Sequence, residues 1–206
     1  MAPTGKPWRR HSERLVYDNP WITIREFDAE APTGARTVYG LVSFKNRAMG
    51  VLPIFEDGTV MLVGQHRFPL GDYSWEIPEG GSPLDDDPLA GAKRELKEET
   101  GLVAEVWREV LSYQLSNSVT DERGLGFIAT GLSQAEAEPD PTESIVLARV
   151  PFAEALEQAV LGRIHDLITV AMLLRAYHMA REGELPEGLA LAMLPRTGRN
   201  DEHSEA

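Results

Sequence analysis

Three glutamates that could hold metal ions lie within five residues of one another, beside an arginine. Glu95, Glu98 and Glu99 follow Arg94 in the run Arg-Glu-Leu-Lys-Glu-Glu. A helix turns about 100° per residue, so it stacks Glu95 on Glu99 and sets Glu98 about 60° to one side. Stacked carboxylates repel each other unless a cation lies between them, and all-oxygen ligand sets suit Mg²⁺ or Mn²⁺. The spacing predicts a divalent metal site, and the alternative is a solvated acidic helix.

Local signals predict the helix that would position these carboxylates. Asp87 is a good N-cap, and Pro88 suits the first helical turn because its missing N–H costs nothing there. Gly101 suits the left-handed conformation that closes a helix. A helix of about three turns is therefore expected between them. Its apolar stripe, which can anchor it to a sheet, consists of Leu89, Ala92 and Leu96.

The segment from Gly80 to Leu102 resembles the Nudix box, written Gly-x5-Glu-x7-Arg-Glu-U-x-Glu-Glu-x-Gly-U, in which U is apolar. Asp86 stands where the family has its first glutamate, and its side chain is one methylene shorter. The remaining positions all match, namely Gly80, Arg94, Glu95, Leu96, Glu98, Glu99, Gly101 and Leu102. The chain is identified as a member of the Nudix hydrolases on these residues.

The resemblance extends over roughly residues 15–180. The run from Gly64 to Gly80 is similar to the Gln-x-Arg…Glu-x-Pro-Ala-Gly run of the ADP-ribose pyrophosphatase branch. The segment Ser118-Val-Thr-Asp-Glu and the loop around Glu143 resemble two later loops of that branch. The resemblance implies Mg²⁺-dependent hydrolysis of a nucleoside diphosphate-sugar, with ADP-ribose the leading substrate and AMP and ribose 5-phosphate the products.

The resemblance also implies a role for each site residue. Arg94 would orient the carboxylates through charge-assisted hydrogen bonds. The implied metal ligands are the backbone carbonyl of Glu79 and the carboxylates of Glu95, Glu98 and Glu99, with Mn²⁺ a possible substitute for Mg²⁺. Glu98 and Glu99 would thereby also take part in catalysis.

Three further residues receive roles from the resemblance, and each keeps an alternative. Arg67 would contact the substrate phosphates, or form a surface salt bridge instead. Glu143 would be the general base, or a solvated residue of an acidic, proline-rich loop. Trp21 would stack on the nucleobase, or pack between subunits.

Composition limits the remaining function classes. The chain has 206 residues, of which 42% are hydrophobic, enough for a packed core. A formal net charge of −13 argues against nucleic-acid and anionic-membrane partners. The absence of cysteine excludes disulfides and thiolate chemistry. With no apolar signal region or membrane-length apolar run, a cytoplasmic protein is expected.

Strands and helices mix without regular βαβ alternation, which predicts an α+β fold with a mixed sheet between helices, as an α/β/α sandwich. We expect an arm over residues 1–13, a small antiparallel sheet over 14–45, a Nudix hydrolase domain over 46–184 and a disordered tail over 185–206. Helices are expected over 152–161 and 166–181. So small a sheet cannot bury its own apolar face, so residues 14–45 are expected to form a homodimer interface.

Two alternatives to the leading function remain. The chain could be a Nudix hydrolase for another nucleoside diphosphate-X compound, such as GDP-mannose, a dinucleoside polyphosphate or a CDP-alcohol. It could instead be a catalytically silent module that senses a nucleotide, although all three box glutamates are present. Fold and box alone do not determine the substrate.

Overall fold

The computed structural model describes residues 5–136 and 144–194. Within them the elements follow one another as β1 (Arg9–Asp18), β2 (Ile22–Glu30), β3 (Arg36–Phe44), β4 (Asn46–Pro53), β5 (Thr59–Arg67), β6 (Asp72–Glu76), β7 (Glu79–Pro83), α1 (Pro88–Thr100), β8 (Leu102–Gln114), β9 (Arg123–Gln134), β10 (Val146–Pro151), α2 (Phe152–Val160), α3 (Leu167–Arg181) and α4 (Glu187–Met193). None of the described helices is long and apolar enough to cross a membrane.

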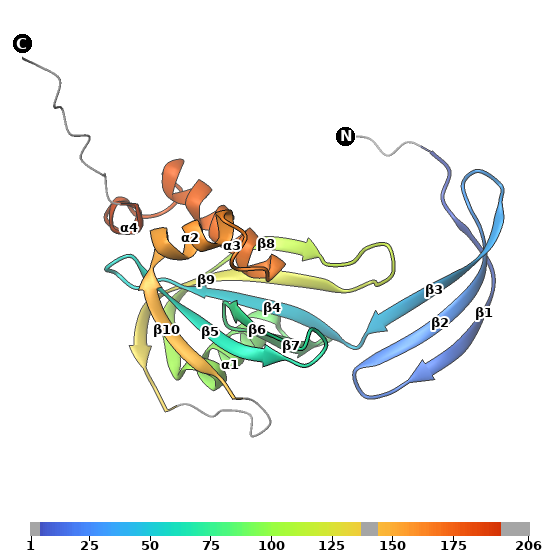
Figure 1. The fold of residues 1–206 in the computed structure, drawn as a ribbon, viewed down its shortest axis with the longest axis horizontal. Coiled ribbons are helices and arrows are strands. Elements are labelled where there is room, and N and C mark those ends of the chain that lie inside the picture. The colour runs from blue at the N-terminus through green and yellow to red at the C-terminus, as the bar shows by residue number, and fades with distance from the viewer. Residues whose placement is uncertain (1–4, 137–143, 195–206) are drawn as a thin grey trace, which may run out of the picture.

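The main body contains two sheets between helices. One has the order β7-β4-β9-β8, in which β4 and β9 are parallel and the other pairings are antiparallel. The other, β10-β5-β6, is antiparallel throughout. Helix α1 and the C-terminal helices α2 and α3 lie on opposite sides of this body (Figure 1). The predicted α+β fold with a mixed sheet between helices is confirmed.

Two hydrophobic cores fill the spaces between strands and helices. Along β4 the side chains alternate, so that Val51 enters the core under α1 and Leu52 enters the core under α2 and α3. Phe127 and Ile128 divide in the same way on β9. The period-two alternation of strands thus gives both faces of the sheet an apolar surface, and fixes α1 against one of them.

The N-terminal sheet, β1-β2-β3, projects from the main body (Figure 1). Strands β2 and β3 pair without interruption from Ile22 opposite Phe44 to Glu30 opposite Arg36. Strand β1 begins at Arg9, so ordered structure starts within the segment for which we expected an arm. Cross-strand contacts explain this earlier start, since Arg9 pairs with Glu30 of β2 and His11 lies 3.2 Å from the Glu30 carboxylate.

The C-terminal segment contains more structure than the sequence pattern indicated. Helices α2 and α3 lie close to the ranges expected for them. Helix α4, however, lies within the segment expected to be a disordered tail, and its last residue Met193 and the preceding Leu185 are buried. Seven residues are too few to display a helical period, so packing rather than pattern defines this helix. Residues 195–206 of that expected tail lie outside the described residues.

Candidate active site

Helix α1 packs on one face of the sheet and holds the box glutamates beside the edge strand β7. The Asp87 side chain accepts a hydrogen bond from the Leu89 N–H at 3.1 Å, and Gly101 closes the helix with φ 68°. Both cap predictions are therefore confirmed. Because Ala92 and Leu96 are fully buried against the sheet, the turns that carry the glutamates cannot rotate away from it. Glu95 and Glu99 are each only 8% exposed.

Strand β7 meets these glutamates through its backbone. The Glu79 N–H donates to the Glu99 carboxylate at 3.0 Å. A Cβ atom added to Gly80 would lie 2.2 Å from the Glu95 carboxyl carbon, so only glycine leaves room for that carboxylate. The strand and the helix therefore fix two of the three predicted carboxylate ligands in place.

Arg94 ties the helix to the strand and to two of its own neighbours. It donates to the Gly81 carbonyl oxygen at 2.7 Å and to Glu95 at 2.6 Å. It also donates to Glu98, one helical turn away, at 2.8 Å. These charge-assisted bonds orient both carboxylates, the role that the family resemblance implies for Arg94.

The donor set on α1 fits a divalent cation. It consists of three carboxylates, two of which form ion pairs with Arg94, and Glu95 and Glu99 are buried. Mg²⁺ and Mn²⁺ prefer such oxygen ligands, and the space beside Gly80 keeps the Glu95 carboxylate against the β7 backbone. The residues present therefore match the chemistry that the box predicts.

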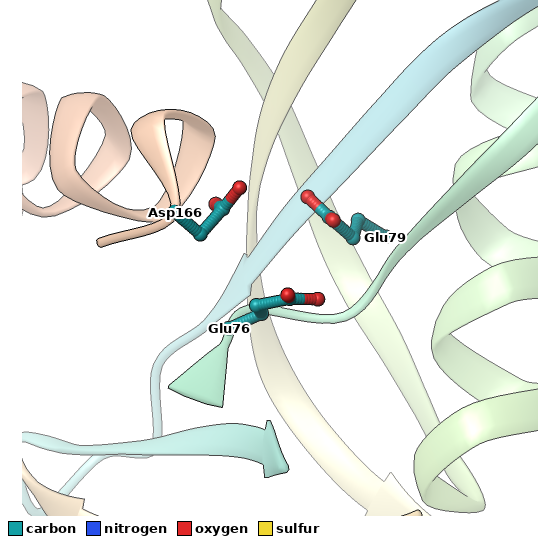
Figure 2. A group of neighbouring side chains, drawn as sticks. All are labelled: Glu76, Glu79 and Asp166. Carbon is teal, nitrogen blue, oxygen red and sulfur yellow. The ribbon is translucent and has the colours of Figure 1, made fainter. Parts of the chain in front are cut away.

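A second acidic cluster lies beside β7. Carboxylate oxygens of Glu76, Glu79 and Asp166 lie within 4.8 Å of one another, and their side chains converge from β6, β7 and the start of α3 (Figure 2). Arg67 supplies positive charge here: its Nε donates to both Glu76 oxygens at 3.0 Å, and its Nη2 donates to Glu79 at 2.8 Å. Asp166 also caps α3 by accepting from the Thr169 N–H at 2.6 Å.

Burial sets the electrostatics of this second cluster. Burial, with the charges of Asp166 and Glu76, raises the pKa of Glu79 well above its usual range. Burial likewise raises the pKa of Asp166. Burial opposes the ionisation of Glu76 as well. Hydrogen bonds to the Glu76 carboxylate, of which the one from Arg67 has the largest effect, outweigh burial and lower the pKa of Glu76. The Arg67–Glu76 pair is therefore ionised, whereas the other two carboxylates compete for the same positive charge.

A cleft of about 650 Å³ is lined by the three box glutamates and, from the second cluster, by Glu79. Trp21 lies at the rim of the cleft and is 67% exposed. Its backbone is held in place because the N–H groups of Trp21 and Ile22 donate to the Asn19 side chain at 2.9 and 2.7 Å. The polar and aromatic residues that line the cleft are Trp21, Phe44, Asn46, Arg47, Arg67, Glu79, Arg94, Glu95, Glu98, Glu99 and Glu122. Every predicted site residue thus lies on one cleft, except Glu143, which is outside the described residues.

The sequence interpretation did not select several residues of this region. Asp166 carries only an N-cap signal, three residues before Thr169, and nothing local places it beside β7. Glu76 belongs to the Glu-Ile-Pro run, where the family pattern could have drawn attention to it. Asn46 and Arg47 at the start of β4 carry no motif at all.

Two protein families match this chain, and together they cover most of its length. The NUDIX domain matches residues 44–168. The nucleoside diphosphate sugar hydrolase N-terminal domain matches residues 8–42, which correspond to the projecting sheet. The two matches together cover both the cleft and the sheet that carries Trp21.

Individual proteins are similar over most of their length. A methanol dehydrogenase activator of Bacillus methanolicus is 31% identical over 157 residues, covering 75% of this chain and 84% of that protein. An ADP-ribose pyrophosphatase of Mycobacterium tuberculosis is 30% identical over 180 residues, covering 84% of each. The crystal structure of an ADP compounds hydrolase superposes with a TM-score of 0.78 at 19% identity, covering 89% of this chain and 100% of that one. This last likeness concerns the fold.

Proposed function

The chain belongs to the Nudix family and is a hydrolase, and from this premise we propose that it hydrolyses the diphosphate linkage of a nucleoside diphosphate-sugar in a Mg²⁺-dependent reaction. ADP-ribose is the first candidate substrate. One observation carries the proposal: a single cleft combines the box glutamates with an exposed tryptophan at its rim. The match of residues 8–42 to a nucleoside diphosphate sugar hydrolase N-terminal domain supports the same substrate class.

In this proposal the Glu79 carbonyl and the carboxylates of Glu95, Glu98 and Glu99 hold Mg²⁺, which Mn²⁺ can replace. When bound, the divalent ions supply positive charge to the diphosphate and Lewis acidity to the attacking water. Arg94 keeps two of these carboxylates oriented through its hydrogen bonds. The buried position of Glu95 and Glu99 limits competition from bulk water.

The remaining steps are proposed for Glu143, which lies outside the described residues, and for Trp21, which lines the cleft. Glu143 takes a proton from the attacking water, a role typical of a carboxylate base. The water attacks one phosphorus in line, the bond from that phosphorus to the bridging oxygen breaks, and the other half leaves as a phosphomonoester, so that ADP-ribose yields AMP and ribose 5-phosphate. Trp21 stacks on the nucleobase, because an exposed aromatic face on a fixed turn suits a planar ring.

A panel assay tests the substrate class. Pure protein is incubated with Mg²⁺ and ADP-ribose, GDP-mannose, a dinucleoside polyphosphate or a CDP-alcohol, and the products are resolved by chromatography. We expect ADP-ribose to be cleaved with the highest kcat/KM and a chelator to stop the reaction. Preferred cleavage of another compound would change the substrate but keep the enzyme class, whereas no cleavage of any compound would favour a silent, nucleotide-sensing module.

We also propose a homodimer with an interface on the N-terminal sheet. One face of this sheet has a hollow lined by Trp8, Phe27, Tyr39 and Leu41, and Trp8 is 47% exposed. Three strands that project from the body gain stability when such a face is covered. Light scattering at micromolar concentration tests the proposal: twice the chain mass of 22.8 kDa is expected, and a fully active monomer would contradict it.

A further inference from the structure

A buried hydroxyl group on α3 holds the backbone connection that leads to Glu79. Thr169, in the first turn of α3, is fully buried, and its Oγ1 accepts a hydrogen bond from the Ile77 N–H at 2.8 Å. Ile77 is fully buried as well, so bulk water cannot take the place of the hydroxyl. The hydrogen bond joins α3 to the connection between β6 and β7, 92 residues earlier in the chain.

Two further hydrogen bonds hold the same connection. The Pro78 carbonyl oxygen accepts from the Val51 N–H of β4 at 2.8 Å. The Glu79 N–H donates to the Glu99 carboxylate of α1 at 3.0 Å. Three consecutive residues are thus held from three different elements, and α3 is the one of the three that follows the box in the chain.

The start of α3 packs tightly against this part of the sheet. Gly50 of β4 pairs with Glu79 of β7, and a Cβ atom at Gly50 would lie 2.7 Å from Cγ2 of Ile168. Asp166 fixes the first turn of the helix, because its carboxylate accepts from the Thr169 N–H at 2.6 Å. Figure 2 shows Asp166 at the start of α3, facing Glu79. The Thr169 hydroxyl therefore has a fixed position relative to β7.

We infer that Thr169 is a positioning residue for the metal site, and that its hydroxyl sets the place of the Glu79 carbonyl. The inference rests on the proposed function, in which that carbonyl is a ligand of the divalent cation. A buried N–H without a partner is costly, so loss of the hydroxyl would displace the connection at Ile77, two residues from Glu79. Mg²⁺ demands near-ideal ligand geometry, so a small displacement of the carbonyl weakens its binding.

The alternative is that Thr169 only stabilises the core. In that case loss of its hydroxyl would lower the free energy of unfolding and leave the affinity for metal unchanged. The two roles therefore differ in metal affinity, which can be measured without turnover.

Titration of the full chain with Mn²⁺, without nucleotide, tests the inference, with free Mn²⁺ measured by electron paramagnetic resonance. Thr169→Val keeps the shape of the side chain but not its hydroxyl, and should raise the Kd for Mn²⁺ by about 10-fold, as is typical when a group that orients a metal ligand is lost. Thr169→Ala is a second variant without the hydroxyl and should show the same loss. Thr169→Ser keeps the hydroxyl and should bind Mn²⁺ within about threefold of wild type.

Two reference variants define the site and the control. Glu99→Gln should weaken Mn²⁺ binding at least as much as Thr169→Val, which identifies the titrated site as that of the box. Met172→Ala is the matched control, because Met172 is a fully buried core residue of the same helix. It should lower stability in urea at least as much as Thr169→Val does, and leave the Kd for Mn²⁺ within about threefold of wild type. Circular dichroism checks that each variant is folded.

Wild-type Mn²⁺ affinity in a folded Thr169→Val or Thr169→Ala variant would overturn the inference. So would an equal loss of affinity in Thr169→Ser or Met172→Ala, since the missing hydroxyl would then not be the cause. Mn²⁺ binding that Glu99→Gln leaves unchanged, or no binding by the wild-type chain, would overturn it as well. Failure of the proposed function is distinguishable, because it would appear as Mn²⁺ binding that depends on Thr169 without hydrolysis of any compound in the panel.

Discussion

Replacement of Gly80 by alanine tests whether the Glu95 carboxylate needs the space that glycine leaves on β7. The added Cβ would lie 2.2 Å from the Glu95 carboxyl carbon, whereas carbon atoms in contact need about 3.5–4.0 Å. The carboxylate must therefore retreat by at least about 1 Å. A misplacement of this size can reduce the rate about 10²-fold. The backbone of Gly80 has no positive φ, so alanine fits the strand itself.

The expected result is a folded enzyme with impaired turnover. Alanine is more favourable than glycine in a strand by roughly 0.5–1 kcal/mol, so the melting temperature should not fall far. We expect kcat to drop about 10²-fold and the Mg²⁺ concentration for half-maximal activity to rise. Steady-state assays across a Mg²⁺ series measure both quantities, and circular dichroism measures the melting temperature.

Gly81→Ala is the matched control. A Cβ at Gly81 would lie 3.0 Å from Nδ2 and 3.3 Å from Cβ of Asn46, an exposed residue, and a shift of a few tenths of an ångström relieves both contacts. Its kcat should stay within about threefold of wild type. Equal losses in the two variants, or a folded Gly80→Ala variant with more than about half of wild-type kcat, would refute the reasoning that this contact positions Glu95.

Three other substitutions test the site and the core. Glu99→Gln should lower kcat by about 10³-fold or more without unfolding, and a variant with more than about a tenth of wild-type activity that is insensitive to chelator would contradict a metal mechanism. Glu143→Gln should lower kcat by about 10²- to 10⁴-fold with little change in KM, and an unimpaired variant would move the base elsewhere in its loop, to Glu138 first. Met172→Ala removes a fully buried side chain and should destabilise the fold by about 2–5 kcal/mol in urea unfolding, so a loss below about 1 kcal/mol would show that the core collapses around the gap.

Local signals determined which elements could be predicted. The boundaries of α1 follow from Asp87, Pro88 and Gly101, whose preferences depend on their own backbone positions. Helix α4 has no N-cap side chain, and its place follows from contacts far along the chain, since a Cβ at Gly58 would lie 2.2 Å from the Ala192 carbonyl carbon. A pattern read along seven residues contains no such information.

The same distinction applies to the site. Glu95, Glu98 and Glu99 share one helix, so their relative placement follows from helical geometry alone. Asp166 reaches Glu79 only because α3 packs against the strands, where the Thr169 hydroxyl accepts from the Ile77 N–H at 2.8 Å. Tertiary packing of this kind leaves no spacing rule in the sequence.

Strand β1 has a consequence for behaviour at high concentration. All ten of its residues are exposed, and its outer edge offers unpaired backbone groups to the strands of other molecules. Two register shifts interrupt the strand, between Arg10 and Ser12 and between Leu15 and Tyr17. Bulges and charged side chains are features by which edge strands resist uncontrolled extension. The projecting sheet therefore carries its own protection against edge-to-edge aggregation, and a dimer built on it would form through a face of the sheet.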